Sequence, residues 1–163
     1  MVKQSDMRKE YTDALISDFT DPLFQRAFQQ YFGELGIAVK DWDGLFREMN
    51  EENEGQKNLA YVRRLADGGA AGFIQFIPIR FSSWFFEGTC GLIREFWVAD
   101  EFRNQGHGSG LLALAERHFL EHGIYTSILT TDTAGRFYER HGYRKAAGCR
   151  AKNHDEVFIK SLG

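Results

Sequence analysis

The sequence is poor in cysteine and proline and has no long apolar run. Two of its 163 residues are cysteine and two are proline. Cys90 and Cys149 lie far apart without CxxC spacing, so we expect reduced thiols and no disulfide scaffold. No stretch of about 18 apolar residues predicts a transmembrane helix, and the first residues lack the apolar core of a secretory signal. These absences predict a cytoplasmic protein with no membrane partner.

Neither sign of charge is in large excess over the other. The formal net charge is −3, and no long basic run occurs that would indicate nucleic-acid binding. Hydrophobic residues make up 43% of the chain and charged residues 26%, as in globular proteins. The length fits one domain that buries its core without disulfides or metals. We therefore expect a single domain over residues 1–163.

The spacing of apolar residues predicts an α/β (α+β) fold. Helical spacing occurs at 22–35, 42–49, 108–122 and 133–141, and strand patterns occur at 59–65, 71–81, 90–98, 124–130, 143–150 and 156–162. Residues 7–17 suit a strand or a helix. Three successive strands before a strand–helix–strand unit indicate a mixed sheet, antiparallel first and partly parallel later. We expect six to seven strands flanked by four helices.

Three local signals refine this prediction. Asp67-Gly68-Gly69 is typical of a hairpin turn, and Gly88 is a candidate for a second turn. Pro78 lies inside a predicted strand, where a residue without an N–H group indicates a bulge or an edge position. Residues 50–57 are polar and indicate a loop.

A glycine-rich segment from Arg103 to Gly110 joins a strand to the clearest amphipathic helix. The free N–H groups and the dipole at such a helix start favour an anion. The segment lacks the lysine of a P-loop, and its glycines are spaced GxGxG and not GxGxxG as in a dinucleotide fold. The pattern that it does match is Arg103-x-x-Gly106-x-Gly108.

Together with Trp97–Phe102, this pattern resembles the coenzyme A loop of the GNAT superfamily of acyl-CoA-dependent N-acyltransferases. A second motif, Ala134-x-x-Phe137-Tyr138-x-x-x-Gly142-Tyr143, is similar to the other hallmark of that family and lies one helix and one strand downstream. The resemblance covers residues 88–160, whereas residues 1–87 match only in element order. It implies an acceptor side in 1–87 and an acetyl-CoA-binding core in 88–163.

The resemblance implies a set of cofactor contacts. Backbone N–H groups from Asn104 to Ser109 would hold the pyrophosphate, Arg103 would add charge and Ser109 a hydroxyl. Thr131 stands where the family often has an asparagine that binds the pantetheine arm, so this contact is altered. The predicted cofactor-binding residues are Trp97, Val98, Arg103, Asn104, Gln105, Gly106, His107, Gly108, Ser109, Gly110, Thr131 and Phe137.

It also implies direct attack of an amine on acetyl-CoA. A backbone N–H of Trp97 or Val98 would polarise the thioester carbonyl. Tyr138 would protonate or hydrogen-bond the leaving thiolate, unless it is only packed on its helix. Glu95 is the first candidate for the base, because a strand period of two puts it on the face of Trp97. Glu34, Glu87 and a water chain are weaker candidates for the base. If Glu95 has no catalytic role, it would suit an ion pair with Arg94 or Arg80.

The remaining features leave the acceptor open. His118 and His122 are spaced i,i+4 but lack an HExxH pattern, so we expect no metal. Aromatic and acidic residues in 22–49 suit either a core or a pocket for an amine. The cluster Phe81–Phe86 suits a pocket wall or the contact of a homodimer. The predicted function is N-acetylation of a small-molecule or peptide amine; the alternative is a non-catalytic acyl-CoA-binding domain.

Overall fold

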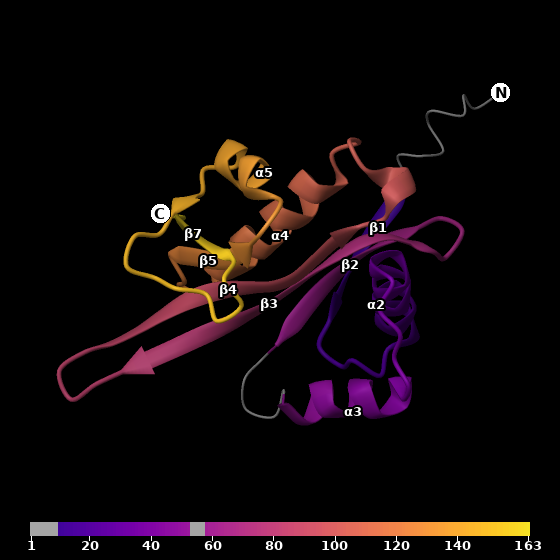
Figure 1. Ribbon diagram of the computed structural model, residues 1–163, viewed down its shortest axis with the longest axis horizontal. Helices are drawn as coiled ribbons and strands as arrows, with labels where there is room; N and C mark the ends of the chain where they lie inside the picture. The colour runs from indigo at the N-terminus through magenta and orange to yellow at the C-terminus, as the bar shows by residue number, and fades with distance from the viewer. Residues whose placement is uncertain (1–9, 53–57) are drawn as a thin grey trace.

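The computed structural model describes residues 10–52 and 58–163, which form one seven-stranded sheet (Figure 1). The strand order is β1-β2-β3-β4-β5-β7-β6. The strands are β1 Tyr11–Ile16, β2 Leu59–Leu65, β3 Ala70–Ser82, β4 Glu87–Val98, β5 Thr126–Thr131, β6 Arg144–Lys145 and β7 Glu156–Ser161. Pairing is antiparallel except between β4 and β5, so the predicted mixed sheet is confirmed.

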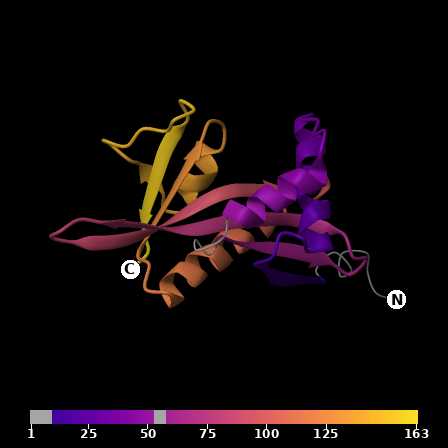
Figure 2. The same ribbon diagram turned by 90° about the horizontal axis from the view of Figure 1, so that it is seen from below.

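Four α-helices cover the sheet, as predicted. They are α2 Pro22–Leu35, α3 Trp42–Glu52, α4 His107–Glu121 and α5 Gly135–Arg140, and a short 3₁₀ helix, η1, spans Asp100–Phe102. Helices α2 and α3 lie on one side of β1–β4, and α4 lies on the other (Figures 1 and 2). Helix α5 packs on β7. The sheet therefore separates two apolar clusters, one under α2 and α3 and one under α4 and α5.

The first of these cores is built from aromatic rings. Phe24, Phe28, Phe46 and Phe73 are buried together, which settles their role as core and not as pocket wall. The second core joins Ile74, Phe76 and Ile93 of the sheet to Leu111, Leu112, Ala115 and Phe119 of α4. Each helix thus buries the apolar stripe that its spacing predicted.

Local chemistry explains where α2 begins and ends. The Asp21 side chain accepts a hydrogen bond from the Leu23 N–H at 2.9 Å, and Pro22 occupies the first turn. Gly36 ends the helix with a φ of 72°, a left-handed conformation that glycine adopts without steric cost.

Several sequence predictions require correction. The turn after β3 lies at Ser83–Phe86, closed by a 2.7 Å bond from the Ser83 N–H to the Phe86 carbonyl, whereas Gly88 lies inside β4. Helix α3 continues to Glu52, so part of the predicted polar loop is helical, and residues 53–57 lie outside the described ones. The strand expected at 143–150 is reduced to β6.

Other local signals are confirmed. Gly68 has a φ of 88° in the β2–β3 turn. Residues 11–16 of the ambiguous opening segment form a strand, and residues 7–9 lie outside the described ones. Pro78 lies beyond Phe76, the last β3 residue paired with β2, and so occupies an edge position. Residues 10–52 and 58–163 contain no helix long and apolar enough to cross a membrane.

Candidate active site

A cleft of about 1200 Å³ opens where β4 and β5 separate. These strands pair only through Gly91 with Ser127 and Leu92 with Ile128, although both continue further. On its other side β4 carries a bulge, because Arg94 and Glu95 together face the single residue Gln75. An extra residue bends a strand and increases its twist. The bulge therefore accompanies the point where β4 leaves β5.

Backbone N–H groups of β4 point into this gap. The Ala99 N–H donates to the Ala71 carbonyl of β3 at 2.8 Å. Successive N–H groups of a strand point to opposite sides. Those of Val98 and Phe96 are therefore directed away from β3, into the cleft, and that of Trp97 toward β3. Of the two predicted carbonyl-polarising donors, the geometry favours Val98 and adds Phe96.

The N-terminus of α4 forms one end of the cleft. Gly106 precedes the helix with a φ of 87°, and within the described residues no side chain caps this end. Asn104 also has a positive φ, of 61°. The cleft is lined here by Arg103, Asn104, Gly106, Gly108 and Ser109. The first N–H groups of α4 are thus available to an anion.

Arg103 lies folded over this loop. Its Nε donates to the Val98 carbonyl at 3.0 Å, and Nη1 is 2.9 Å from Asp100. Arg103 therefore forms an ion pair with Asp100 at the surface. Because the Arg103 side chain is about half exposed, the guanidinium has room to turn toward a bound phosphate.

Three predicted cofactor residues do not face the cleft. The Gln105 amide donates to the Glu101 carbonyl at 3.1 Å. His107 is buried, and Gly110 faces the Arg63 guanidinium on the side of α4 away from the cleft. None of these three lines the cleft. For His107 and Gly110, helical periodicity explains this, since only part of a turn faces any one side.

The hydroxyls of Ser109 and Thr131 both have partners. Thr131 Oγ1 accepts from the Ala134 N–H at 3.1 Å. Ser109 Oγ lies 2.8 Å from Nε2 of His141, whose Nδ1 lies 2.7 Å from the Phe137 carbonyl. A carbonyl only accepts, so Nδ1 carries a proton, and in the neutral ring Nε2 accepts from Ser109. His141 is a cleft residue that the motifs did not indicate.

Tyr138 lies deep in the cleft. Its ring packs with those of Phe96, Tyr143 and Phe158, and its residue surface is only 7% exposed. Burial raises the pKa of the Tyr138 phenol well above its ordinary value of 10. The hydroxyl is therefore protonated at neutral pH and suited to donate a hydrogen bond.

Glu95 faces the cleft from the acceptor side. Tyr31 of α2 donates its hydroxyl proton to Glu95 Oε2 at 2.8 Å. Burial, and next the Glu95 carboxylate, raise the pKa of Tyr31 far above 10, so Tyr31 remains the donor. Glu95 and Trp97 both contact α2, as their spacing predicted. Tyr31 replaces the arginine partners considered from the sequence.

The alternative carboxylates have other roles in the structure. Glu34 accepts from Trp97 Nε1 at 2.6 Å and from the Asp100 N–H at 3.2 Å. Glu87 pairs with Arg80 at 3.2 Å on the exposed β3–β4 arm and does not line the cleft. Glu34 and Glu95 both line the cleft, but Glu95 is held there by a neutral phenol, which leaves its negative charge available to an amine.

His118 of α4 and His122 just after this helix lie outside the cleft. The rings of His118 and His122 stack with centroids 4.1 Å apart. No cluster of three or more metal-ligating side chains is found among residues 10–52 and 58–163.

Comparison with known protein families matches residues 7–143 to the model of the acetyltransferase (GNAT) family. The match spans most of the chain. The chain belongs to the GNAT acetyltransferase family. Comparison with curated proteins gives no match.

Solved structures share the GNAT fold at low identity. A Desulfovibrio desulfuricans protein named as a GNAT-family acetyltransferase has a TM-score of 0.69 at 16% identity, covering 94% of this chain and 100% of its own. An aminoglycoside 6′-N-acetyltransferase complexed with coenzyme A has a TM-score of 0.68 at 15% identity, covering 93% and 97%. A Klebsiella pneumoniae protein named as an acyl-CoA N-acyltransferase has a TM-score of 0.61 at 20% identity, covering 94% and 98%. At these identities the likeness concerns the fold.

Proposed function

We propose that this GNAT protein transfers an acetyl group from acetyl-CoA to the primary amine of a small molecule or peptide. The observation that carries the proposal is the gap between β4 and β5, which joins an uncapped helix N-terminus to a phenol and a carboxylate. The family and the coenzyme A complex of a structural neighbour support the cofactor class. In this proposal residues 1–87 form the acceptor side and 88–163 the cofactor side.

The proposed cofactor site uses the chain's own backbone. The first N–H groups of α4 bind the phosphates, and the thioester arm extends along the gap toward Tyr138. The Val98 N–H donates to the carbonyl oxygen, where negative charge develops in the transition state. Phe137 packs between Phe96 and Gly108 and forms an apolar wall for the arm.

The proposed reaction transfers the acetyl group and moves protons at both ends of the site. The ammonium of the acceptor first gives a proton to Glu95, because only a neutral amine is nucleophilic. The amine nitrogen then bonds to the carbonyl carbon, the carbon–sulfur bond breaks, and the nitrogen loses its second proton to solvent. Tyr138 donates a hydrogen bond to the leaving thiolate, which takes a proton from solvent. Glu95 releases its proton to solvent and is ready for the next amine. The products are the amide and free coenzyme A.

The acceptor side of the cleft favours a cation. Carboxylates outnumber arginines in the lining by five to three: Glu34, Glu95, Asp100, Asp132 and Asp155 against Arg94, Arg103 and Arg140. Arg103 pairs with Asp100, whereas Glu95 is bonded by a neutral phenol. Tyr31 and Phe96 add aromatic surface on which a cation is also favoured. We propose that the substrate is an amine in the cytoplasm. We also propose that neither nucleic acid nor a membrane is a partner.

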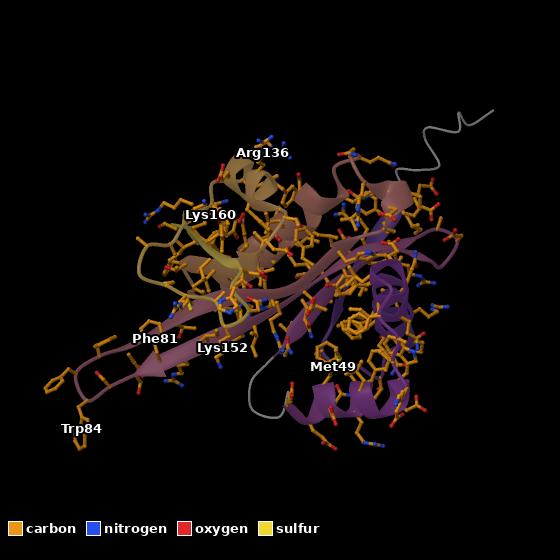
Figure 3. All side chains as sticks on the ribbon, viewed as in Figure 1. Met49, Phe81, Trp84, Arg136, Lys152 and Lys160 are labelled. Carbon is orange, nitrogen blue, oxygen red and sulfur yellow. The ribbon has the colours of Figure 1, made fainter. Side chains whose placement is uncertain are left out.

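We also propose that the chain forms a homodimer through the tip of the β3–β4 arm. Trp84 and Phe85 are 99% and 97% exposed there, and Phe86 is 62% exposed. Figure 3 shows Trp84 at the far end of the arm, and none of these three residues lines the cleft. Three such rings amount to roughly 500–600 Å² per copy, so two copies covering each other would bury about 1000–1200 Å², near the lower limit of a specific interface.

The arm favours contact through side chains. Pro78 removes one donor from the outer edge of β3, which opposes the addition of another strand. The Ser83–Phe86 turn is held by its own hydrogen bonds, with the Phe85 N–H donating to Ser83 Oγ at 3.2 Å. A two-fold contact of tip on tip satisfies the self-complementarity that a symmetric dimer requires.

Consumption of acetyl-CoA, followed by thiol detection across polyamines, aminoglycosides, amino acids and lysine peptides, tests the proposed activity. Tyr138→Phe should lower kcat about 10²-fold with the Kd for coenzyme A unchanged, because only the hydrogen bond to the leaving thiolate is lost. Turnover that survives this change intact would contradict the role of Tyr138.

A non-catalytic acyl-CoA-binding domain is the second candidate, favoured by the engagement of the Thr131 hydroxyl with the Ala134 N–H. Coenzyme A binding in calorimetry without turnover of any amine would support this candidate. Absence of coenzyme A binding would overturn both.

A further inference from the structure

Arg63 is a buried cation that the proposed reaction does not use. It lies on β2, and its residue surface is 4% exposed. Asp13 stands directly opposite on β1 and binds the guanidinium with both oxygens, at 2.8 Å from Nε and 3.1 Å from Nη2. The Tyr11 ring covers the guanidinium carbon at 3.9 Å. An arginine is rarely buried so fully without such partners.

The guanidinium packs directly on the first turn of α4. A Cβ atom at Gly110 would lie 2.7 Å from both Nη1 and Nη2, so only glycine permits this approach. Nη1 also lies 3.3 Å from Nδ1 of His107. The same turn presents Gly108 and Ser109 to the cleft on its other side. Arg63 is therefore in contact with the rear of the proposed phosphate-binding turn.

His107 connects the arginine to this turn. Because Arg63 only donates, Nδ1 of His107 accepts and the ring is neutral with its proton on Nε2. Burial and then the Arg63 charge lower the pKa of His107, and the Asp13 carboxylate acts in the opposite sense. The rings of Tyr11 and Phe102 pack against the imidazole at right angles and fix its plane.

The charge of Arg63 is itself informative. A cation beside a helix N-terminus opposes the helix dipole. Asp13 offsets part of this cost, and a bound polyanion in front of the turn would make the remaining charge favourable. A turn containing Gly106, Gly108 and Gly110 also has little side-chain packing of its own to hold its N–H groups in place.

We propose that Arg63 is a positioning residue for the phosphates of the acyl-CoA cofactor. Held by Asp13, it fixes the first turn of α4 through His107 and Gly110 and adds positive charge behind the phosphate site. The inference rests on the proposed cofactor site and extends it to a residue that contacts neither the cleft nor the cofactor. It predicts that Arg63 matters only for donors that carry the coenzyme A phosphates.

Two acetyl donors separate positioning from general damage to the fold. Acetyl-CoA carries the phosphates, whereas S-acetyl-N-acetylcysteamine carries the thioester end alone. In Arg63→Met we expect KM for acetyl-CoA and Kd for coenzyme A to rise at least about tenfold, as the loss of one charged hydrogen bond implies. We expect kcat with acetyl-CoA, and kcat/KM with the truncated donor, to stay within about twofold of the wild type. Arg64→Met, the exposed neighbour on β2, is the matched control and should change none of these values.

Conservative variants guard against a variant that does not fold. Arg63→Lys keeps the charge but not the planar fork, and should give a smaller rise in KM. His107→Asn keeps an acceptor near the position of Nδ1 and should recover most of the affinity that His107→Phe loses. Melting temperatures are measured for every variant.

The outcomes distinguish the inference from the proposed function. Unchanged KM and Kd in Arg63→Met and Arg63→Lys, or equal losses with both donors, would overturn the positioning role while wild-type activity stands. If His107→Asn and His107→Phe lose affinity equally, the contact through His107 is wrong. A wild type that does not bind coenzyme A overturns the proposed function itself.

Discussion

At the scale of single residues, the Tyr31–Glu95 pair allows the sharpest test of the chemistry. Glu95→Gln keeps the hydrogen bond from Tyr31 but cannot accept the amine proton. We expect kcat to fall about 10²-fold or more while Kd for coenzyme A is unchanged. Tyr31→Phe removes only the contact that orients the carboxylate, so its loss of kcat should be smaller.

Glu87→Gln is the control for this pair, because Glu87 is paired with Arg80 on the exposed arm. Steady-state kinetics with the best amine of the panel provide the measurement. Wild-type kcat in Glu95→Gln across the pH range would mean that a water chain and not Glu95 takes the proton.

A second residue-scale prediction concerns stability against acid. Burial lowers the pKa of His107 and of His118 below the ordinary 6.5 in the folded chain. At pH values between the lowered pKa of the folded chain and the ordinary pKa of the unfolded chain, the unfolded chain therefore binds more protons than the folded chain. The free energy of unfolding is then highest above pH 6.5 and falls as the pH drops below it.

Urea unfolding at pH 7 and pH 5 measures this loss of stability. In His107→Asn the loss should be smaller than in the wild type, since Asn does not titrate. His154→Asn is the control: His154 is exposed with a φ of 67°, a conformation that asparagine tolerates. The same pH dependence in His107→Asn and wild type would show that His107 does not contribute.

Residue types were predictable from the sequence, but not the direction in which each side chain points. The motif pointed to Arg103, Gly108 and Tyr138, and all three line the cleft. His107 lies in the glycine-rich motif, yet it turns to Arg63. This partner on β2 lies 44 residues away in sequence. No local pattern carries such a contact.

At the scale of elements, the C-terminus of α2 offers a matched pair of glycines. Gly33 lies inside the helix with no atom within 4 Å of an added Cβ, whereas Gly36 adopts a φ of 72° just after it. Gly33→Ala should raise the free energy of unfolding by about 0.5–1 kcal/mol. Gly36→Ala should lower it by about 1–2 kcal/mol, because Cβ is unfavourable in the left-handed region.

Urea denaturation of both variants checks these values. Each glycine is close in sequence to Glu34, so binding of coenzyme A to both variants serves as a control for the site. Stabilisation by Gly36→Ala would mean that the helix end can move out of the left-handed conformation.

Helices and strands were largely predictable because their apolar periods are local. The apolar periods give no sign of the gap between β4 and β5. The bulge at Arg94 and Glu95 that accompanies the gap depends on how β4 pairs with β3. Strand pairing joins segments that are distant in sequence. The period-two pattern of one strand does not show where its neighbour separates from it. The Gly88 turn was wrong for a similar reason: the glycine serves the packing of Phe81 across the hairpin.

At the scale of the whole molecule, the proposed site lies between the two cores. Tyr31 and Glu34 come from the helices of the first core, and Tyr138 and Phe137 from those of the second. The sheet carries both halves, so the acceptor side and the cofactor side are joined through β4. Arg63 of β2 connects the two halves a second time, because it contacts Asp13 of β1 and His107 of α4.

The aromatic tip is the feature that such a site does not explain, and it leads to the last prediction. Trp84 and Phe85 are almost fully exposed, and an apolar surface of this size usually marks an interface. If two tips pack together, Trp84→Ser with Phe85→Ser should convert a dimer to a monomer in sedimentation velocity. Since no tip residue lines the cleft, Kd for coenzyme A should not change.

The control replaces exposed aromatic surface elsewhere: Tyr125→Ser, at a residue 58% exposed, should leave the dimer intact. A wild type that sediments as a monomer at every concentration would overturn the homodimer, and binding of that monomer to lipid vesicles would assign the tip to a membrane surface instead. Because the tip is remote from the cleft, a dimer formed there leaves both clefts open to solvent. Each copy should then turn over independently, so specific activity should not depend on protein concentration across the monomer–dimer range, and a cooperative dependence would mean that the two copies contact each other at the site.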